Sequence, residues 1–163
     1  MKKFSFALGL LSSVLFIASC SVSKEARTYK NNIDGKWQLQ TLVSEGIAGN
    51  TKATILNEAD ISCFIGSNWT FNRNNSLGTY SISQNAGQCA AVTRNFRWSI
   101  YESKDQPAIF QFKKLDDKYK EVDEGSAGYR FTIVQSNETT MQLRNDVTFE
   151  GKQASFIYNF TRN

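Results

Sequence analysis

Histidine is missing from this chain of 163 residues. Its absence excludes nucleophiles activated by a Ser-His or Cys-His pair. With three cysteines and no histidine, the chain also has no recognisable spacing of metal ligands. The acidic pairs Asp116-Asp117 and Asp123-Glu124 fall in a polar segment, where a cluster of solvated charges is the interpretation that we favour. We therefore expect a protein that is not an enzyme and that uses no metal or cofactor.

No apolar run is long enough to cross a bilayer as a helix. The longest, residues 4–18, has about 15 residues, whereas a span needs about 20. Two lysines precede this run and a short Ile-Ala-Ser sequence leads from it to Cys20, a pattern that indicates an export signal. The segment resembles a bacterial lipoprotein signal, in which the cysteine is lipidated and becomes the first residue of the mature protein. We assign residues 1–19 to this signal peptide and Cys20 to a lipid anchor such as palmitate; an uncleaved membrane span is the alternative.

Little net charge remains once such a signal is removed. The chain has 19 Lys and Arg residues against 15 Asp and Glu residues, and loss of Lys2 and Lys3 leaves 19 − 2 = 17 against 15, a net charge of +2. No basic block or arginine-rich helix remains, so the electrostatic footprint of a nucleic-acid-binding protein is missing. Residues 20–163 suit one domain with one core, and we expect a monomer.

Two cysteines, Cys63 and Cys89, remain once Cys20 is assigned to the anchor. In an exported protein an even pair predicts a disulfide. Closure of a loop of about 27 residues stabilises a fold by roughly 3.5 kcal/mol on the chain-entropy model. A metal site and a reactive thiol are the alternatives, and the spacing supports neither of them.

Residues 20–32 are polar and show no periodicity. We therefore expect a flexible tether between the lipid and the domain, with an r.m.s. reach of about 20 Å for about 12 residues of coil. Ser21 follows the anchor in place of the aspartate that retains many lipoproteins at the inner membrane, which favours the outer membrane. The predicted location is the cell envelope, with the protein on the periplasmic face or at the cell surface.

From residue 33 onward the dominant period of the apolar residues is two, which predicts an all-β domain over 33–163. Alternating runs rich in aromatic and β-branched residues predict eight strands near 33–40, 68–72, 78–82, 96–100, 108–112, 129–133, 141–143 and 156–160. A short helical segment is expected within 51–60, and a long exposed loop over 116–127. Eight strands joined mostly by hairpins bury one apolar face economically by closing into an up-and-down antiparallel barrel; a two-sheet sandwich is the alternative.

A resemblance to a known family rests on motifs that agree in order and spacing. Gly35-Lys36-Trp37 lies on the first expected strand, the cysteine pair flanks the early hairpin, and Phe160-Thr161-Arg162 closes the last strand. Together with the lipoprotein signal, these features resemble the lipocalin-like domain of bacterial lipoproteins. The resemblance implies that Gly35 and Trp37 close one end of the barrel and that Arg162 stacks over the indole. Such a cation–π contact is worth about 1 kcal/mol.

The resemblance also implies that the barrel binds a small apolar ligand. The candidate lining residues are the aromatic side chains that we expect to point inward: Phe71, Tyr80, Trp98, Phe110, Phe112, Tyr129 and Phe131. Ligand pockets are mostly apolar with a few polar groups, which suits this set. The same residues also fit an ordinary core at period two. A different functional class, an envelope protein that inhibits lysozymes or proteases through the loop at 116–127, is the alternative.

Overall fold

The computed structural model describes residues 23–47, 53–83, 89–123, 128–149 and 151–163. Its helices are α1 (Lys24–Ile33) and α2 (Ile61–Phe64). Its strands are β1 (Gly35–Glu45), β2 (Thr54–Ile55), β3 (Ala59–Asp60), β4 (Asn68–Asn72), β5 (Leu77–Ile82), β6 (Val92–Tyr101), β7 (Ile109–Leu115), β8 (Tyr129–Ser136), β9 (Thr140–Phe149) and β10 (Lys152–Arg162).

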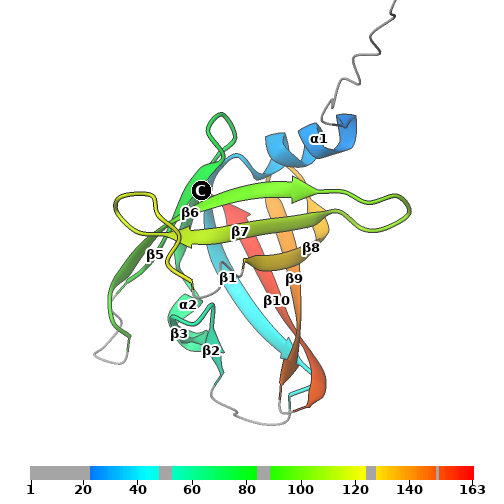
Figure 1. Cartoon of the computed structure of the whole chain (residues 1–163). Coiled ribbons are helices and arrows are strands. Elements are labelled where there is room, and N and C mark those ends of the chain that lie inside the picture. The colour runs from blue at the N-terminus through cyan, green and yellow to red at the C-terminus, as the bar shows by residue number, and fades with distance from the viewer. Residues whose placement is uncertain (1–22, 48–52, 84–88, 124–127, 150) are drawn as a thin grey trace, which may run out of the picture.

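Eight of these strands form a closed barrel in the order β1-β10-β9-β8-β7-β6-β5-β4 (Figure 1). Every neighbouring pair is antiparallel, and β1 closes the barrel by pairing with both β10 and β4. The predicted eight-stranded up-and-down barrel is therefore confirmed. The remaining strands, β2 and β3, pair with each other outside the barrel wall. None of the described helices is long and apolar enough to cross a membrane.

Alternation along the strands sends one set of side chains into the barrel. On β4, for example, Trp69 and Phe71 are buried while the residues on either side of each are exposed. The register of the β4–β5 hairpin places Trp69 opposite Tyr80 and Phe71 opposite Gly78. The core is therefore a single cluster rich in aromatic residues.

The expected flexible tether is wrong for residues 24–32, which belong to helix α1. The Ser23 hydroxyl caps this helix by accepting a 2.9 Å hydrogen bond from the Ala26 amide. Ala26, Tyr29 and Ile33 recur at helical spacing and pack on the core, with Ala26 and Ile33 buried. The helix covers the end of the barrel where β1 begins (Figure 1), which we call the closed end. Ile33 accordingly ends this helix and does not begin the first strand.

The expected helix within 51–60 is also wrong where the structure describes it. Residues 54–60 form the β2–β3 hairpin, and the helix follows it as α2. Leu56 and Asn57 at the tip of the hairpin have positive φ values of 55° and 50°, which produce a tight reversal that a helix does not contain. This segment covers the other end of the barrel, which we call the open end, and Ile55, Leu56 and Phe64 are buried there.

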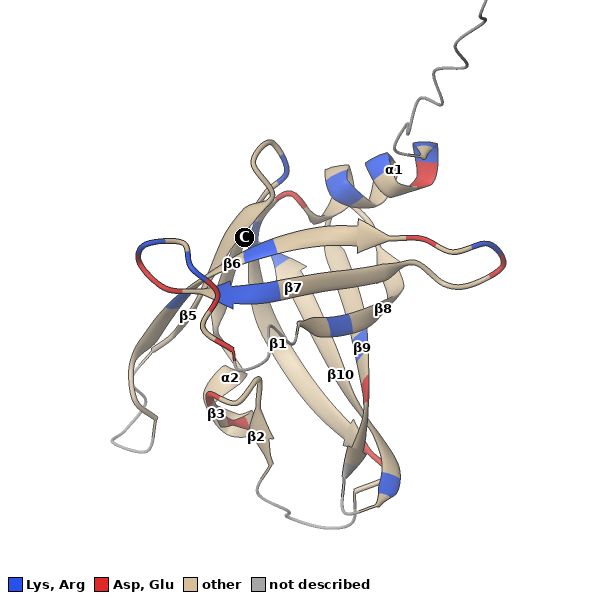
Figure 2. Ribbon diagram, viewed as in Figure 1, with Lys and Arg blue, Asp and Glu red and all other residues tan. Residues whose placement is uncertain are grey.

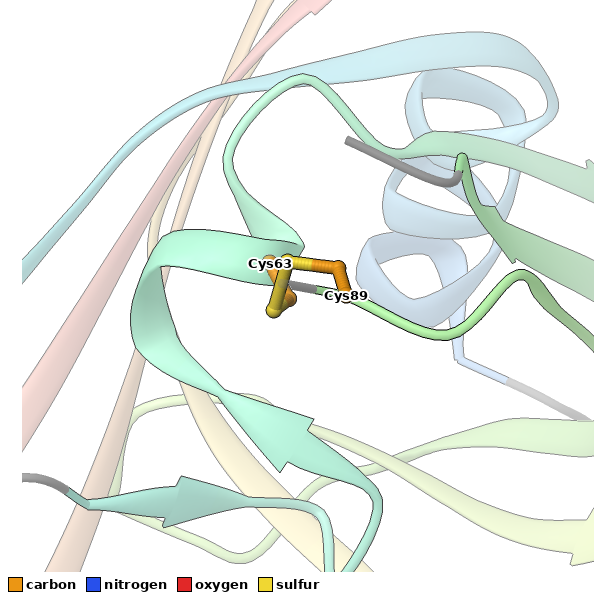
Figure 3. Close-up of a disulfide and its surroundings, with 2 residues drawn as sticks. All are labelled: Cys63 and Cys89. Atoms are coloured by element: carbon orange, nitrogen blue, oxygen red, sulfur yellow. A yellow bond between two sulfur atoms is a disulfide. The ribbon is translucent and has the colours of Figure 1, made fainter. Parts of the chain in front are cut away.

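A disulfide attaches the covering segment to the barrel. Cys63 of α2 is bonded to Cys89, which precedes β6, and their Cα atoms are 5.6 Å apart (Figure 3). The predicted pairing is therefore confirmed. The bond holds the base of the β2–β3 hairpin segment against the wall, because α2 follows directly on β3.

Candidate functional site

The closed end of the barrel is built around the three residues that the sequence singles out. The Arg162 guanidinium lies over the Trp37 indole, 4.4 Å from its ring centroid. It also donates hydrogen bonds of 2.6 Å to the main-chain carbonyls of Asp34 and Asn32. Gly35 has a φ of +115°, and a Cβ at this position would lie 2.5 Å from Arg162 Nη1. The contact of Arg162 with Trp37 therefore requires a residue without a Cβ at position 35.

The seven candidate lining residues lie mostly in the packed interior. Six of them are at most 2 % exposed: Phe71, Tyr80, Trp98, Phe110, Phe112 and Phe131. Neighbouring rings are in contact, with centroids 5.7 Å apart for Phe71 and Phe110 and 5.8 Å apart for Phe112 and Phe131. These distances are typical of directly packed aromatic pairs. The structure therefore places these six in the core, while the seventh, Tyr129, lies at the open end.

At the open end, the tip of the β2–β3 hairpin is held by side chains of the barrel wall. The carbonyl oxygen of Leu56 accepts a 2.7 Å hydrogen bond from Lys114 Nζ and a 2.9 Å hydrogen bond from the Tyr129 hydroxyl. Its positive φ is uncommon for a non-glycine residue and costs free energy. The two hydrogen bonds offset that cost. The hairpin is thus a cover with defined contacts to the wall.

A buried group of charges surrounds these contacts. Lys114 is 5 % exposed, and its ammonium lies 3.1 Å from Asp123 Oδ1 and 3.6 Å from Glu58 Oε2. Glu58 also pairs with Arg94 at 2.7 Å and accepts a 2.9 Å hydrogen bond from the Tyr80 hydroxyl. Two cations therefore face two carboxylates, and the cluster has the pairing that buried charge requires.

The protonation of this cluster follows from the same contacts. Burial acts to raise the pKa of Glu58, but hydrogen bonds from Arg94 and Tyr80 and the charges of Arg94 and Lys114 outweigh it, so this pKa lies below 4.5. The pKa values of Tyr80 and Tyr129 are raised, first by burial and then by the carboxylates of Glu58 and Asp123 respectively. Glu58 is therefore ionised and both phenols are neutral near pH 7.

A cavity of about 370 Å³ lies between the hairpin and the inner face of β8, β9 and β10 at the open end. Its apolar lining comes from Ile55, Leu56, Val147 and Phe156. The phenol of Tyr158 lines the same cavity, and its hydroxyl is buried without a hydrogen-bond partner among the described residues. Burial, and then the nearby Tyr129, raises the pKa of Tyr158. Its hydroxyl therefore keeps its proton, and this proton has no acceptor among the described residues.

A second buried atom at this end also lacks a partner. Oδ2 of Asp123 makes no hydrogen bond with the described residues, whereas Oδ1 lies 2.9 Å from the Tyr129 hydroxyl, whose single proton it shares with the Leu56 carbonyl. Unsatisfied buried polar atoms are uncommon in native structures. One donor, on Tyr158, and one acceptor, on Asp123, are thus available near the hairpin tip. Within the described residues, no cluster of acidic or cysteine side chains has a geometry that holds a metal ion.

Residues 33–143, more than half of the chain, match the family model described as a lipocalin-like domain. The chain belongs to the lipocalin-like domain family. The family that its motifs suggested is therefore confirmed.

Several solved structures are similar to this chain at low sequence identity. Apocrustacyanin C2 has a TM-score of 0.50 and 11 % identity over 85 % of this chain and 65 % of its own. Lobster apocrustacyanin A1 has a TM-score of 0.45 at 13 % identity, over 85 % and 65 %. Bovine odorant-binding protein, solved with its natural ligand, has a TM-score of 0.43 at 11 % identity, over 81 % and 72 %.

The similarity to apocrustacyanin C2 shows a shared fold and gives no information about ligands. This chain spans less than two thirds of the length of both apocrustacyanin chains. No match to the chain is found among curated proteins. The function of this lipocalin-like domain therefore has to be argued from its own cavity and its own polar groups.

Sequence reasoning missed the charged cluster, although part of its signal is present. Lys114 is an even number of residues from Phe110 and Phe112 on β7, and Arg94 is two residues from Phe96 on β6, so each lies on the same strand face as these phenylalanines. Strict alternation therefore sends both basic side chains inward. Glu58 and Asp123 lie outside the barrel strands, so no periodicity reports their burial.

Proposed function

We propose that this lipocalin-like domain is a small-molecule binder held at a membrane surface by a lipid on Cys20. The observation that carries the binding proposal is the open-end cavity with the unpartnered hydroxyl of Tyr158. Its volume of about 370 Å³ lies within the usual range of ligand pockets. The proposed site is this cavity under the hairpin, because packed rings occupy the deeper interior.

The lining defines the class of ligand. Ile55, Leu56, Val147 and Phe156 favour an apolar body, since binding removes their apolar surface from water. A ligand with one acceptor, such as a carbonyl, ether or hydroxyl oxygen, pairs with Tyr158 and satisfies a buried donor. Thr54, Asn57, Asn145 and Asp146 also line the cavity, so we expect a compact molecule with an apolar body and at least one polar group.

The proposed anchor also defines how the barrel stands on the membrane. Cys20 precedes Lys24, the first residue of α1, by four positions, so the anchor lies within about 14 Å of the helix in any conformation. The closed end therefore faces the bilayer. β1 runs from that end to the open end over 11 residues, which at the usual strand tilt places the hairpin about 25 Å farther out. Ligand then enters from the aqueous side.

The anchor and the binding activity are tested separately. Cells that express the full chain are labelled with an alkyne fatty acid, and the Cys20 peptide is analysed by mass spectrometry. We expect a lipidated peptide at the new N-terminus and a Cys20→Ser variant that carries no label. An unmodified Cys20 would reject the anchor and the predicted outer-membrane location.

Native mass spectrometry of the protein purified from its own envelope tests binding. We expect a bound small molecule that is lost when the barrel is unfolded. A protein that is free of ligand, and that stays free after exposure to an extract of the envelope, would reject the binding proposal.

A second candidate, an inhibitor of lysozymes or proteases, is favoured by the loop that follows β7. Tyr119 and Val122 are 53 % and 42 % exposed there, and an exposed aromatic residue on a loop is a suitable anchor for a protein partner. Residues 124–127 of the predicted loop lie outside the described residues. Assays with lysozymes and serine proteases test this candidate, and full enzyme activity at micromolar protein would reject it.

A further inference from the structure

A second cavity, of about 590 Å³, lies on the outer wall of the barrel across β6, β7 and the start of β8. It is lined by Ser76, Arg97, Trp98, Ser99, Gln111, Phe112, Lys113, Glu121, Gly128 and Arg130. We call it the outer groove. It adjoins the open-end cavity, since Gly128 and Arg130 line both, but most of its side chains are on the solvent side of the sheet.

The strand register brings three cations together in the outer groove. Arg97 is directly opposite Lys113, and Arg130 is directly opposite Gln111, two residues before Lys113. Neighbouring strands are about 4.8 Å apart, so Arg97 on β6 and Arg130 on β8 lie about 10 Å apart across the sheet, with Lys113 on the strand between them. Figure 2 shows basic residues on these three neighbouring strands.

These cations are poorly neutralised within the described part of the chain. Lys113 pairs with Glu121 at 2.9 Å, and Glu121 is the one carboxylate in the lining. Arg97 forms no ion pair with a described residue, and the Arg130 guanidinium lies over the Tyr101 ring at 5.5 Å. Like charges directly opposite each other on adjacent strands are unfavourable. An anion in the groove would remove that repulsion.

The floor of the outer groove includes Trp98, Phe112 and Gly128. Trp98 and Phe112 turn their side chains into the core, and Gly128 has none. A Cβ on Gly128 would lie 3.2 Å from the carbonyl oxygen of Phe112, so glycine keeps this floor low. Hydroxyl and amide groups of Ser76, Ser99 and Gln111 stand beside it, with Gln111 Nε2 donating a 3.0 Å hydrogen bond to Ser99 Oγ.

We propose that the outer groove binds an anionic sugar, with a phosphate group held by Arg97 and Arg130. Guanidinium groups form paired, charge-assisted hydrogen bonds with phosphate. The neutral hydrogen-bonding groups beside them suit sugar hydroxyls. The same chemistry occurs in a free sugar phosphate and in the phosphorylated headgroup of a glycolipid. This site does not depend on the lipid anchor or on the open-end cavity.

Isothermal titration of the purified protein with glucose 1-phosphate, inorganic phosphate and lipopolysaccharide micelles tests the proposal. We expect wild type to bind glucose 1-phosphate more tightly than inorganic phosphate. The double variant Arg97→Gln/Arg130→Gln should lose at least about tenfold in affinity. The double variant Lys118→Gln/Lys120→Gln removes the same charge from a neighbouring exposed loop and should bind like wild type.

Each outcome of these titrations decides a specific point. Binding of the micelles but not of glucose 1-phosphate supports the site and identifies a headgroup as its source. If both double variants lose the same amount of affinity, the loss comes from overall charge, and the proposed site is wrong. If inorganic phosphate binds as tightly as glucose 1-phosphate, the groove does not recognise the sugar. If wild type binds none of the three probes, the proposal is wrong. Thermal unfolding of the variants, whose substituted side chains are exposed, checks that they are folded.

Discussion

Arg162 and Trp37 lie directly opposite each other on the antiparallel strands β10 and β1, and the guanidinium covers the indole face. The indole in turn donates a 2.8 Å hydrogen bond from Nε1 to the carbonyl oxygen of Ile33, the last residue of α1. Trp37 thus joins the last strand, the first strand and the terminal helix. The contacts of Trp37 therefore tie together the elements that close this end of the barrel.

Trp37→Ala should destabilise the domain by about 3–5 kcal/mol, the usual cost of removing a large buried aromatic side chain. Denaturant unfolding followed by circular dichroism measures the loss. The specificity of ligand binding in the remaining folded protein should not change, since Trp37 is far from the open end. A variant that unfolds at the same denaturant concentration as wild type would contradict the closing role of Trp37.

Gly35→Ala should also destabilise the barrel, because its Cβ would meet Arg162 and its φ of +115° is strained for any other residue. We expect a cost of about 2 kcal/mol or more. Gly151→Ala is the control: it has a positive φ of 76°, but no atom of the described residues lies within 4 Å of the added Cβ. Equal losses of unfolding free energy in the two variants would show that contact with Arg162 is unimportant.

Lys114→Ala should cost about 3–5 kcal/mol of unfolding free energy, because it leaves the buried carboxylates of Glu58 and Asp123 without their shared cation. Its neighbour provides the control. Lys113 faces solvent and pairs with Glu121, so Lys113→Ala should cost at most about 1 kcal/mol. The reverse order of the two losses in chemical denaturation would refute the buried cluster.

Acid should weaken the fold through Glu58. Its pKa is lower in the folded chain than the ordinary value of 4.5, so ionised Glu58 stabilises the fold above pH 4.5, and this contribution is lost as the pH falls through the folded pKa. Unfolding free energies measured from pH 7 downward should therefore fall more steeply in wild type than in Glu58→Gln. If the unfolding free energies of the two proteins fell in parallel with pH, the contacts of Glu58 with Arg94 and Tyr80 would contribute no stability.

The barrel and its closed end were predictable from sequence because they depend on local signals. Period-two alternation defined the strands, and Gly35 and Trp37 marked the first of them. Helix α1 was missed because its apolar stripe of Ala26, Tyr29 and Ile33 is sparse and its cap is a single serine. Tertiary packing against the closed end, which no local pattern reports, stabilises such a short helix.

The open-end site was less predictable for a different reason. The cavity is formed by the β2–β3 hairpin, whose tip depends on positive φ values at Leu56 and Asn57 and on hydrogen bonds from Lys114 and Tyr129. Those contacts join segments that are far apart in the chain. Inward alternation identified the aromatic residues, but it did not distinguish the rings that fill the core from Tyr129 at the cavity.

The central claim is that the open-end cavity binds a small apolar ligand, and a fluorescence titration with 1-aminoanthracene tests it most directly. Val147→Phe adds a ring to the cavity lining, and Val43→Phe places the same ring on the exposed face of β1, where Val43 is 48 % exposed. We expect saturable one-to-one binding by wild type and by Val43→Phe, and at least about a tenfold loss of affinity in Val147→Phe. Equal affinity in all three proteins, or no saturable binding by wild type, would contradict the claim.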